Sequence, residues 1–286
     1  MFGQLLASLT DGLLLGFVYG LAAMGLSLIW GVMTVINLAH GPVIAMGMFG
    51  SYFLFIQAGV NPYLALLPVA SLGLVAGFLI YGTAVHWVID APHLSSLLAT
   101  FAVNMIIIGL GTAAFTTSPH NIDYPLGALR AGDWFSVSYT RLIAAVAAVA
   151  ITAGLYLFLY FTRPGKAIRA VANNRMAAEL MGIPSAYILA LSFGIGTMLA
   201  ALAGGLIATF FPFTILSGGP YELKSFVICV LGGLGNPLGA LVGGLLLGGL
   251  EGIIPTIMPV SWVPVVEFGL FVLVLLVRPT GLFGAK

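Results

Sequence analysis

Few side chains of this sequence could do acid–base, nucleophilic or metal chemistry, and their spacing builds no catalytic site. The histidines lack the i, i+3 or i, i+4 spacing that sets two ligands on one helix face, so we expect no metal site; they are His40, His86, His93 and His120. Cys229 is the one cysteine and lies in an apolar run, which indicates a packing residue. No serine or cysteine is associated with a histidine and an acid. We therefore expect a chain that is not an enzyme.

The glycine-rich strings do not build a nucleotide site either. Residues 163–167 read Arg-Pro-Gly-Lys-Ala and lack the upstream glycine and the serine or threonine of a phosphate-binding loop. The Gly-x-Gly at 233–235 has no βαβ unit around it, which favours a turn at the membrane. If this chain takes part in an ATP-driven process, the ATPase must be another chain.

Two pairs of polar residues interrupt apolar sequence. Asn37 and His40 are three residues apart, and Thr100 and Asn104 are four apart. These spacings set each pair on one helix face, and polar side chains at membrane depth usually face the protein interior and mark a transport path. The alternative is structural: hydrogen bonds between helices, or a cap at the end of a span. Glu251 is expected at the interface or paired, because a charge at the bilayer centre costs about 2.5–3.5 kcal/mol.

Composition determines the elements that position these residues. The chain has 286 residues, of which 61% are hydrophobic and 6% are charged, whereas a soluble domain has about 25% charged residues. So few charged residues cannot cover a water-exposed surface, which excludes a soluble enzyme, a disordered chain and a nucleic-acid-binding protein. One helical span takes roughly 20 residues. The fold class is therefore all-α, a polytopic transmembrane helical bundle of about eight spans.

The apolar runs predict where the spans lie, namely near 10–33, 40–57, 62–88, 96–116, 141–162, 187–211, 225–253 and 262–278. Two stretches, 34–41 and 232–239, are either tight turns at the membrane face or broken, re-entrant helices at depth. The second stretch contains the predicted structural glycines Gly232, Gly233, Gly235 and Gly239. Segment 117–140 is expected to be a small ordered loop with a short hairpin.

Stripes of small residues recur at every fourth position within several spans. Gly12, Gly16 and Gly20 form one such stripe. Four-residue spacing places the stripe on one helix face, where two backbones can approach closely. We expect packing between helices of the same chain, with a subunit interface as the alternative.

Basic residues concentrate in one loop, which contains Arg163, Lys166, Arg169 and Arg175. A basic excess in a short loop marks the cytoplasmic side of a membrane. Residues 166–181 contain no glycine or proline, and the signals that flank them predict a short helix. Its small face could let another protein approach closely, and the alternative is a helix lying on anionic lipid headgroups. Arg278 follows the last apolar run and predicts a cytoplasmic C-terminus.

Four stretches in this order resemble the LivH-type permease subunits of branched-chain amino acid ABC importers. They are Val35–Gly41, Gly165–Ile183, Val230–Ala240 and Arg278–Phe283, and their spacing matches over nearly the full length. The resemblance implies a single permease domain over 1–286, with 163–184 as a cytoplasmic coupling segment. It implies that this segment contacts an ATPase through Arg169, Ala170, Asn173, Asn174, Ala177, Ala178, Met181 and Gly182.

The same resemblance implies a function: the permease subunit of an ATP-driven, binding-protein-dependent importer for branched-chain or related amino acids. The implied partners are a second, homologous permease, two cytoplasmic ATPases that bind ATP and Mg²⁺, and a periplasmic substrate-binding protein. No cofactor on this chain is implied, and the location is the bacterial inner membrane. Related systems carry urea, amides or aromatic acids, so the substrate stays open. The alternative function is a stand-alone secondary transporter or channel for small solutes, although such carriers usually place ionisable groups at the midplane.

Overall fold

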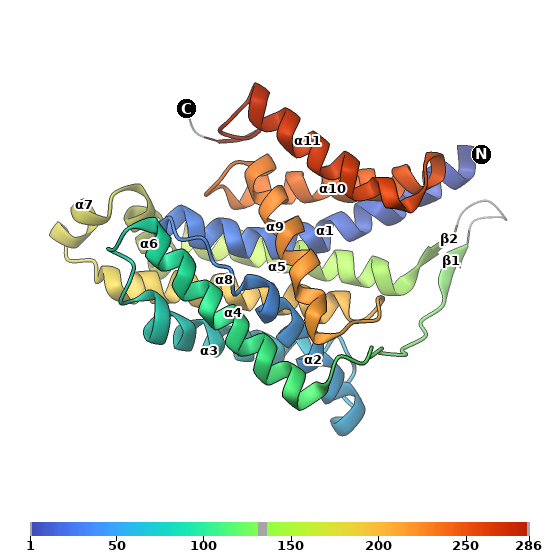
Figure 1. The fold of residues 1–286 in the computed structure, drawn as a ribbon, viewed down its shortest axis with the longest axis horizontal. Coiled ribbons are helices and arrows are strands. Elements are labelled where there is room, and N and C mark those ends of the chain that lie inside the picture. Colours follow the sequence, from blue (N-terminus) through green and yellow to red (C-terminus); the bar gives the residue numbers. More distant parts are fainter. Residues whose placement is uncertain (1, 131–135, 285–286) are drawn as a thin grey trace.

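The chain folds into a bundle of long apolar helices, as its composition predicts. The computed structural model describes residues 2–130 and 136–284 (Figure 1). Within that part, eight helices are long and apolar enough to cross a membrane. They are α1 (Phe2–Met33), α2 (His40–Ala58), α3 (Leu66–Ile80) continued by the π-helix Tyr81–Val85, α4 (His93–Phe115), α5 (Tyr139–Phe161), α8 (Ser185–Ile207), α10 (Pro237–Ile257) and α11 (Val263–Val277) preceded by the 3-10 helix Val260–Trp262. The protein is therefore a multi-pass membrane protein.

Shorter elements connect these helices. Between α5 and α8 lie α6 (Arg163–Asn173) and α7 (Arg175–Leu180), and α9 (Gly218–Gly232) precedes α10. The hairpin expected in 117–140 is confirmed, because β1 (Ala128–Arg130) pairs antiparallel with β2 (Ser136–Ser138). Figure 1 shows α6 and α7 at one end of the bundle and the hairpin at the other.

Two predicted helices are each interrupted. The span expected at 225–253 is instead α9 and α10, because Gly233 (φ 101°) and Gly235 (φ 82°) adopt the left-handed conformations that glycine allows and so turn the chain. The helix expected over 166–181 is also divided, since Asn174 is extended (φ −157°) and its side chain accepts from Ala177 N at 3.0 Å. An asparagine in that role starts a new helix.

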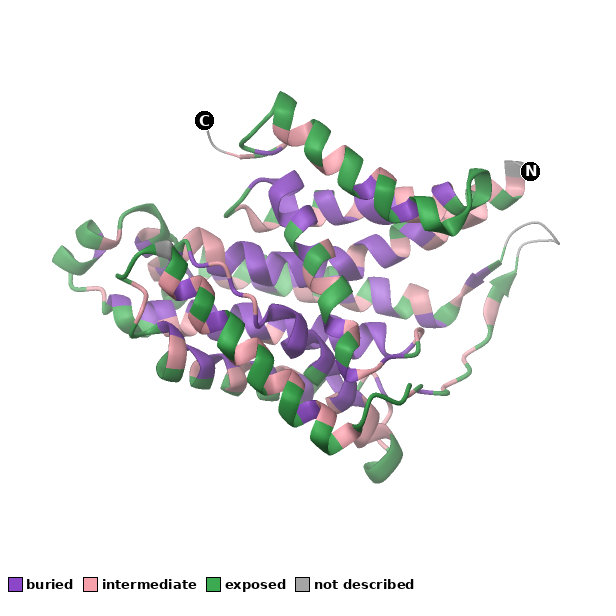
Figure 2. Cartoon of the chain, viewed as in Figure 1, coloured by how far each residue is buried: buried purple, intermediate pink, exposed green. Residues whose placement is uncertain are grey.

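The centre of the bundle is formed by α1 and α8. In an apolar stretch of 18 residues from each helix, 83% of the residues are buried in α1 and 72% in α8, against 11% in α4 and in α11 (Figure 2). The two central helices cross where Gly25 and Gly196 meet, and a Cβ on Gly196 would lie 2.7 Å from the Gly25 carbonyl oxygen. Small residues are therefore required for this crossing.

The glycine stripe of α1 packs against a second glycine stripe on α10, which confirms packing within the chain. A Cβ on Gly16 would lie 2.7 Å from the Gly244 carbonyl oxygen, and one on Gly244 would lie 2.5 Å from Gly20 Cα. Real Cβ atoms do not approach backbone so closely, so neither helix can carry a larger residue at these positions without moving apart.

The helices form two structural repeats of opposite direction. In α1–α4 and in α8–α11, a long central helix is followed by a segment without α-helix and then by a helix that begins inside the bundle, α2 or α9 (Figure 1). Both starts carry the pattern Leu-x-x-Gly-Pro, at 38–42 and 216–220. The two starts meet, since a Cβ on Gly41 would lie 2.7 Å from the Gly218 carbonyl oxygen. Such inverted repeats with broken helices at their interface are typical of transporters.

The α1–α10 contact makes a testable prediction about stability. Gly244→Ala is expected to lower the thermal unfolding temperature of the detergent-solubilised protein, because overpacking costs about 1–3 kcal/mol. Gly154→Ala is the matched control, since nothing lies within 4 Å of a Cβ there, and alanine favours a helix by up to about 1 kcal/mol over glycine. Equal melting temperatures for the two variants would contradict the packing.

Candidate functional site

The segment between α5 and α8 forms the first candidate site, and α6 anchors it to the bundle. The Thr162 hydroxyl accepts from Gly165 N at 3.1 Å, and Pro164 lies in the first turn of α6. Both features are typical of a helix start. Ile168 and Val171 are 1% and 2% exposed. One face of α6 is thus buried in the protein, so α6 cannot rotate or shift without moving α5.

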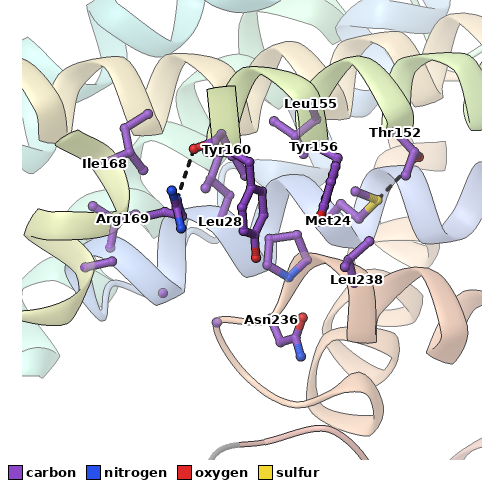
Figure 3. Close-up of a pocket in the computed structure, with 16 residues that line it drawn as sticks. Met24, Leu28, Thr152, Leu155, Tyr156, Tyr160, Ile168, Arg169, Asn236 and Leu238 are labelled. Carbon is purple, nitrogen blue, oxygen red and sulfur yellow. Dashed lines mark hydrogen bonds between the residues drawn. The ribbon is translucent and has the colours of Figure 1, made fainter. Parts of the chain in front are cut away.

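Arg169 strengthens this anchor. Its Nε donates to the Leu159 carbonyl oxygen at 3.0 Å, and its guanidinium carbon lies 4.2 Å from the centre of the Tyr160 ring, a cation–π contact. Figure 3 shows the side chain at the end of a cavity of about 310 Å³ between α1, α5, α6 and the start of α10. The residue predicted to contact a partner therefore also holds α6 against α5.

The outer surface of α7 is apolar. Met176, Leu180 and Met181 are 74%, 84% and 82% exposed, which is unusual on a short helix outside the spans. Met181 was expected from the sequence, whereas Met176 and Leu180 were missed, although two apolar residues four apart in a charged segment are a readable signal. We name this set the α7 apolar surface.

The structure places most of the predicted coupling residues on the surface. Those exposed are Arg169, Asn173, Asn174, Ala177, Met181 and Gly182, and Ala170 is half-buried. Ala178 is 5% exposed. The expectation of one small face that includes both Ala177 and Ala178 is therefore wrong, because the break at Asn174 turns Ala178 inward.

Charged groups fix the orientation of α7. Arg175 donates to Asp90 at 2.8 Å and to Glu179 at 3.2 Å, and the Ser185 hydroxyl at the start of α8 donates to Glu179. These hydrogen bonds, that of Ser185 first, hold the pKa of Glu179 below its ordinary value. The stabilisation from these hydrogen bonds is thus fully present at pH values above the ordinary pKa of a glutamate. It is lost only as the pH falls through the lowered pKa of Glu179. The hydrogen bonds tie α7 to α8 and to the turn at 86–90 that precedes α4.

The second candidate site is the non-helical segment 34–39 between α1 and α2. Thr100 donates to the Ile36 carbonyl oxygen at 3.0 Å, and Asn104 donates to the Leu38 carbonyl oxygen at 2.5 Å. His40 Nε2 lies 3.0 Å from the Ala22 carbonyl oxygen. The structure thus gathers Asn37, His40, Thr100 and Asn104 around one break.

The hydrogen bonds of Thr100 and Asn104 satisfy backbone carbonyl groups that the break leaves without helical partners, a requirement inside a bilayer. Thr100 and Asn104 therefore have a structural role, although they tie α4 to the non-helical segment and not to a second helix as the alternative expected. The expectation that Asn37 and His40 share one helix face is wrong, because Asn37 precedes the helix in the non-helical segment. A path role for these residues stays a prediction.

Glu222 was not foreseen at this site. Its carboxylate reaches from α9 to the first turn of α2, where a Cβ on Gly41 would lie 2.5 Å from Glu222 Oε2. There it accepts a hydrogen bond from the Gly41 backbone N–H, one of the amide groups that have no carbonyl partner in the first turn of a helix. The repeated Leu-x-x-Gly-Pro pattern was the one available signal that α9 starts beside α2.

Ionic contacts continue along α9. Lys224 donates to Glu251 at 2.6 Å, which confirms that Glu251 is paired, and Lys224 Nζ lies 4.0 Å from a Glu267 carboxylate oxygen. The three residues belong to α9, α10 and α11. Ionisable residues inside a membrane bundle usually pair with one another and mark functional regions.

Comparison with known proteins gives a consistent match. Residues 8–275 match the family described as the branched-chain amino acid transport system permease component. The high-affinity branched-chain amino acid transport system permease protein LivH of Salmonella typhimurium is 32% identical over 98% of this chain and 95% of its own. The corresponding protein BraD of Pseudomonas aeruginosa is 32% identical over the same shares, 98% and 95%. The ribose import permease protein RbsC of Escherichia coli is 28% identical over 81% of this chain and 72% of its own.

The cap of α7 makes a prediction that hydrogen–deuterium exchange can check. Asn174→Ala removes the acceptor for Ala177 N, and losing such a cap costs about 1 kcal/mol, so the amides of 177–180 should exchange several times faster. Asn173→Ala is the control, because Asn173 makes no side-chain hydrogen bond within the described residues. Unchanged exchange in Asn174→Ala would show that α7 does not depend on this cap.

Proposed function

The chain belongs to the branched-chain amino acid permease family, and from this premise we propose that it is the membrane-spanning subunit of an ATP-driven importer for branched-chain or related amino acids. Its relatives are transport permeases rather than enzymes. The observation that carries the proposal is the pair α6–α7, which is anchored to the bundle on one side and presents the α7 apolar surface on the other. Figure 1 shows the pair projecting at one end of the molecule.

In this proposal α6–α7 is the coupling segment and contacts a cytoplasmic ATPase. ATP and Mg²⁺ bind to two such ATPase subunits, because the chain has no phosphate-binding loop of its own. A second, homologous permease completes the path, and a periplasmic binding protein delivers the substrate. Residues 1–286 form one permease domain in the bacterial inner membrane. The basic residues of 163–175 support a cytoplasmic α6–α7, and α11 ends at the same end of the bundle.

The contacts explain how motion of α6–α7 could reach the path. Because α6 is bonded to the end of α5 through Arg169 and Thr162, and Glu179 joins α7 to the start of α8, the segment moves both helices as one body. In turn α8 packs on α1, α2 and α3. A displacement of α8 therefore acts directly on the broken helices, which supports alternating access between the two sides.

Reconstitution tests the proposed function. The assembled complex in lipid vesicles, with its binding protein, should accumulate radioactive leucine only when ATP and Mg²⁺ are supplied to the ATPase side. The same chain alone should transport nothing. Uptake by the chain alone, driven by an ion gradient, would instead support a secondary transporter.

A bulky side chain on α7 tests the coupling role. Ala177→Trp should abolish co-purification of the ATPases or reduce ATP-driven uptake at least about tenfold, because a misfit of about 1–3 kcal/mol at an interface weakens binding by that order. Ala177 suits this test because it is exposed, whereas Ala178 is buried.

Val146→Trp is the control for that variant, since Val146 is 62% exposed on α5, away from α6–α7. Full uptake by Ala177→Trp, with ATPases bound as in the control, would remove α7 from the interface.

A further inference from the structure

A groove of about 510 Å³ runs along α9 between α4 and α11. Its walls combine apolar side chains with charged or amide ones, chiefly Phe101, Asn104, Glu222, Lys224, Glu267 and Phe268. Figure 2 shows that the outer side of α9, between these two peripheral helices, is exposed. The groove is thus an open face of the single chain rather than part of its core.

The groove lies at membrane depth. Asn104 is midway along α4, Glu267 is near the middle of the span Val260–Val277, and α9 itself begins inside the bundle beside the start of α2. A lipid-facing charge at the centre of a helix costs about 2.5–3.5 kcal/mol, and such residues normally face a bundle interior or a water-filled cavity. Three ionisable side chains in one groove therefore argue against lipid as its occupant.

Two polar atoms of the groove have no hydrogen-bond partner among the described residues. They are Oε1 of Glu267, whose side chain is 5% exposed, and Oδ1 of Asn104. Lys224 Nζ is 4.0 Å from Glu267 Oε1, too far for a hydrogen bond, because it bonds to Glu251 at 2.6 Å. A buried carboxylate oxygen of this kind needs a donor, so Glu267 is suited to receive a cationic group.

An α-amino acid offers the matching chemistry: an ammonium group with several N–H donors, a carboxylate, and an apolar side chain if it is branched-chain. We propose that this groove is the wall of the substrate path contributed by this chain, where the substrate ammonium pairs with Glu267 and its carboxylate with Lys224. The inference rests on the proposed function. Phe101, Leu223 and Phe268 form the apolar surface for the substrate side chain.

Glu251 explains how such a site could release its substrate. It holds Lys224 while no substrate carboxylate is present, so departure of the substrate leaves no unpaired lysine in the membrane. An unpaired buried charge is strongly destabilising, whereas exchange of one carboxylate for another nearly conserves the interaction. Binding in the groove is therefore weak, as passage along a path requires.

Thiol labelling of the assembled complex tests whether the groove is a water-filled path. In a Cys229→Ser background that retains leucine uptake, Leu223→Cys is compared with Ile106→Cys. The two sites are 57% and 59% exposed, but Leu223 lines the groove, and Ile106 lies on the opposite side of α4 from Asn104. A charged, membrane-impermeant methanethiosulfonate is the probe. During ATP turnover, Leu223→Cys should react at least about tenfold faster, and leucine-loaded binding protein should slow the reaction.

Equal labelling rates at the two sites would overturn the proposal, because the groove would then face lipid or a dry subunit interface. Uptake by the unmodified complex is measured in the same vesicles. If that complex imports no amino acid, the proposed function is wrong. If it imports leucine while the labelling rates are equal, only the assignment of the groove to the substrate path is wrong.

Substitution of Glu267 tests the role of its charge. Glu267→Gln should lower leucine uptake at least about tenfold while ATP hydrolysis stimulated by the binding protein persists, so that fewer leucine molecules enter per ATP. Glu267→Asp should restore part of the ratio, and Asp123→Asn, which removes an exposed carboxylate in 117–140 outside the groove, should leave it unchanged.

If Glu267 only took part in a structural ion network, Glu267→Gln would lower leucine uptake and ATP hydrolysis together. A leucine-to-ATP ratio in Glu267→Gln equal to that of the unmodified complex would therefore overturn the ammonium contact. If Glu267→Gln does not assemble, the labelling of Leu223→Cys decides by itself whether the groove is the path.

Discussion

The structure depends on one constraint: every backbone polar group inside a bilayer needs a partner within the protein. The chain breaks its helices at membrane depth twice, before α2 and before α9, and each break would leave carbonyl and amide groups unpaired. Thr100 and Asn104 on α4 supply donors to the first break, and Glu222 supplies a carboxyl acceptor to the start of α2. The polar residues scattered through apolar sequence are thus first of all the partners of broken backbone.

The two breaks meet because the molecule is built from inverted repeats. The central helices of the repeats cross at Gly25 and Gly196, and the glycine stripes of α1 and α10 bring a third helix into backbone contact. Without a hydrophobic driving force between helices in lipid, such close packing is the main source of association. It also leaves α9 uncovered on one side, between α4 and α11, where Glu222, Lys224 and Glu267 line the groove.

A series of rigid contacts connects α6–α7 to the centre of the bundle. α6 and α7 are bonded to α5 and α8, and α8 packs on the helices around the first break, so a load on the α7 apolar surface acts on the centre of the bundle. The cation–π contact of Arg169 and the hydrogen bonds to Glu179 hold the orientation of α6–α7, while the α7 apolar surface stays exposed. Transport by alternating access needs a rigid segment of this kind together with a bundle centre that can adopt two arrangements.

The sequence by itself determined the class, the spans and the position of the basic loop, because hydropathy, charge and glycine or proline signals act locally along the chain. It also located the break before α2 and the turn between α9 and α10, and it gave pairing as one of two alternatives for Glu251, but it did not locate the break before α9. It could not show that 166–181 divides at Asn174, that Ala178 turns inward, or that Glu222 reaches Gly41. These depend on which helices become neighbours, and the inverted repeats that decide it share little sequence beyond Leu-x-x-Gly-Pro. The tertiary structure alone therefore decided which polar residues hold the backbone and which ones line the groove.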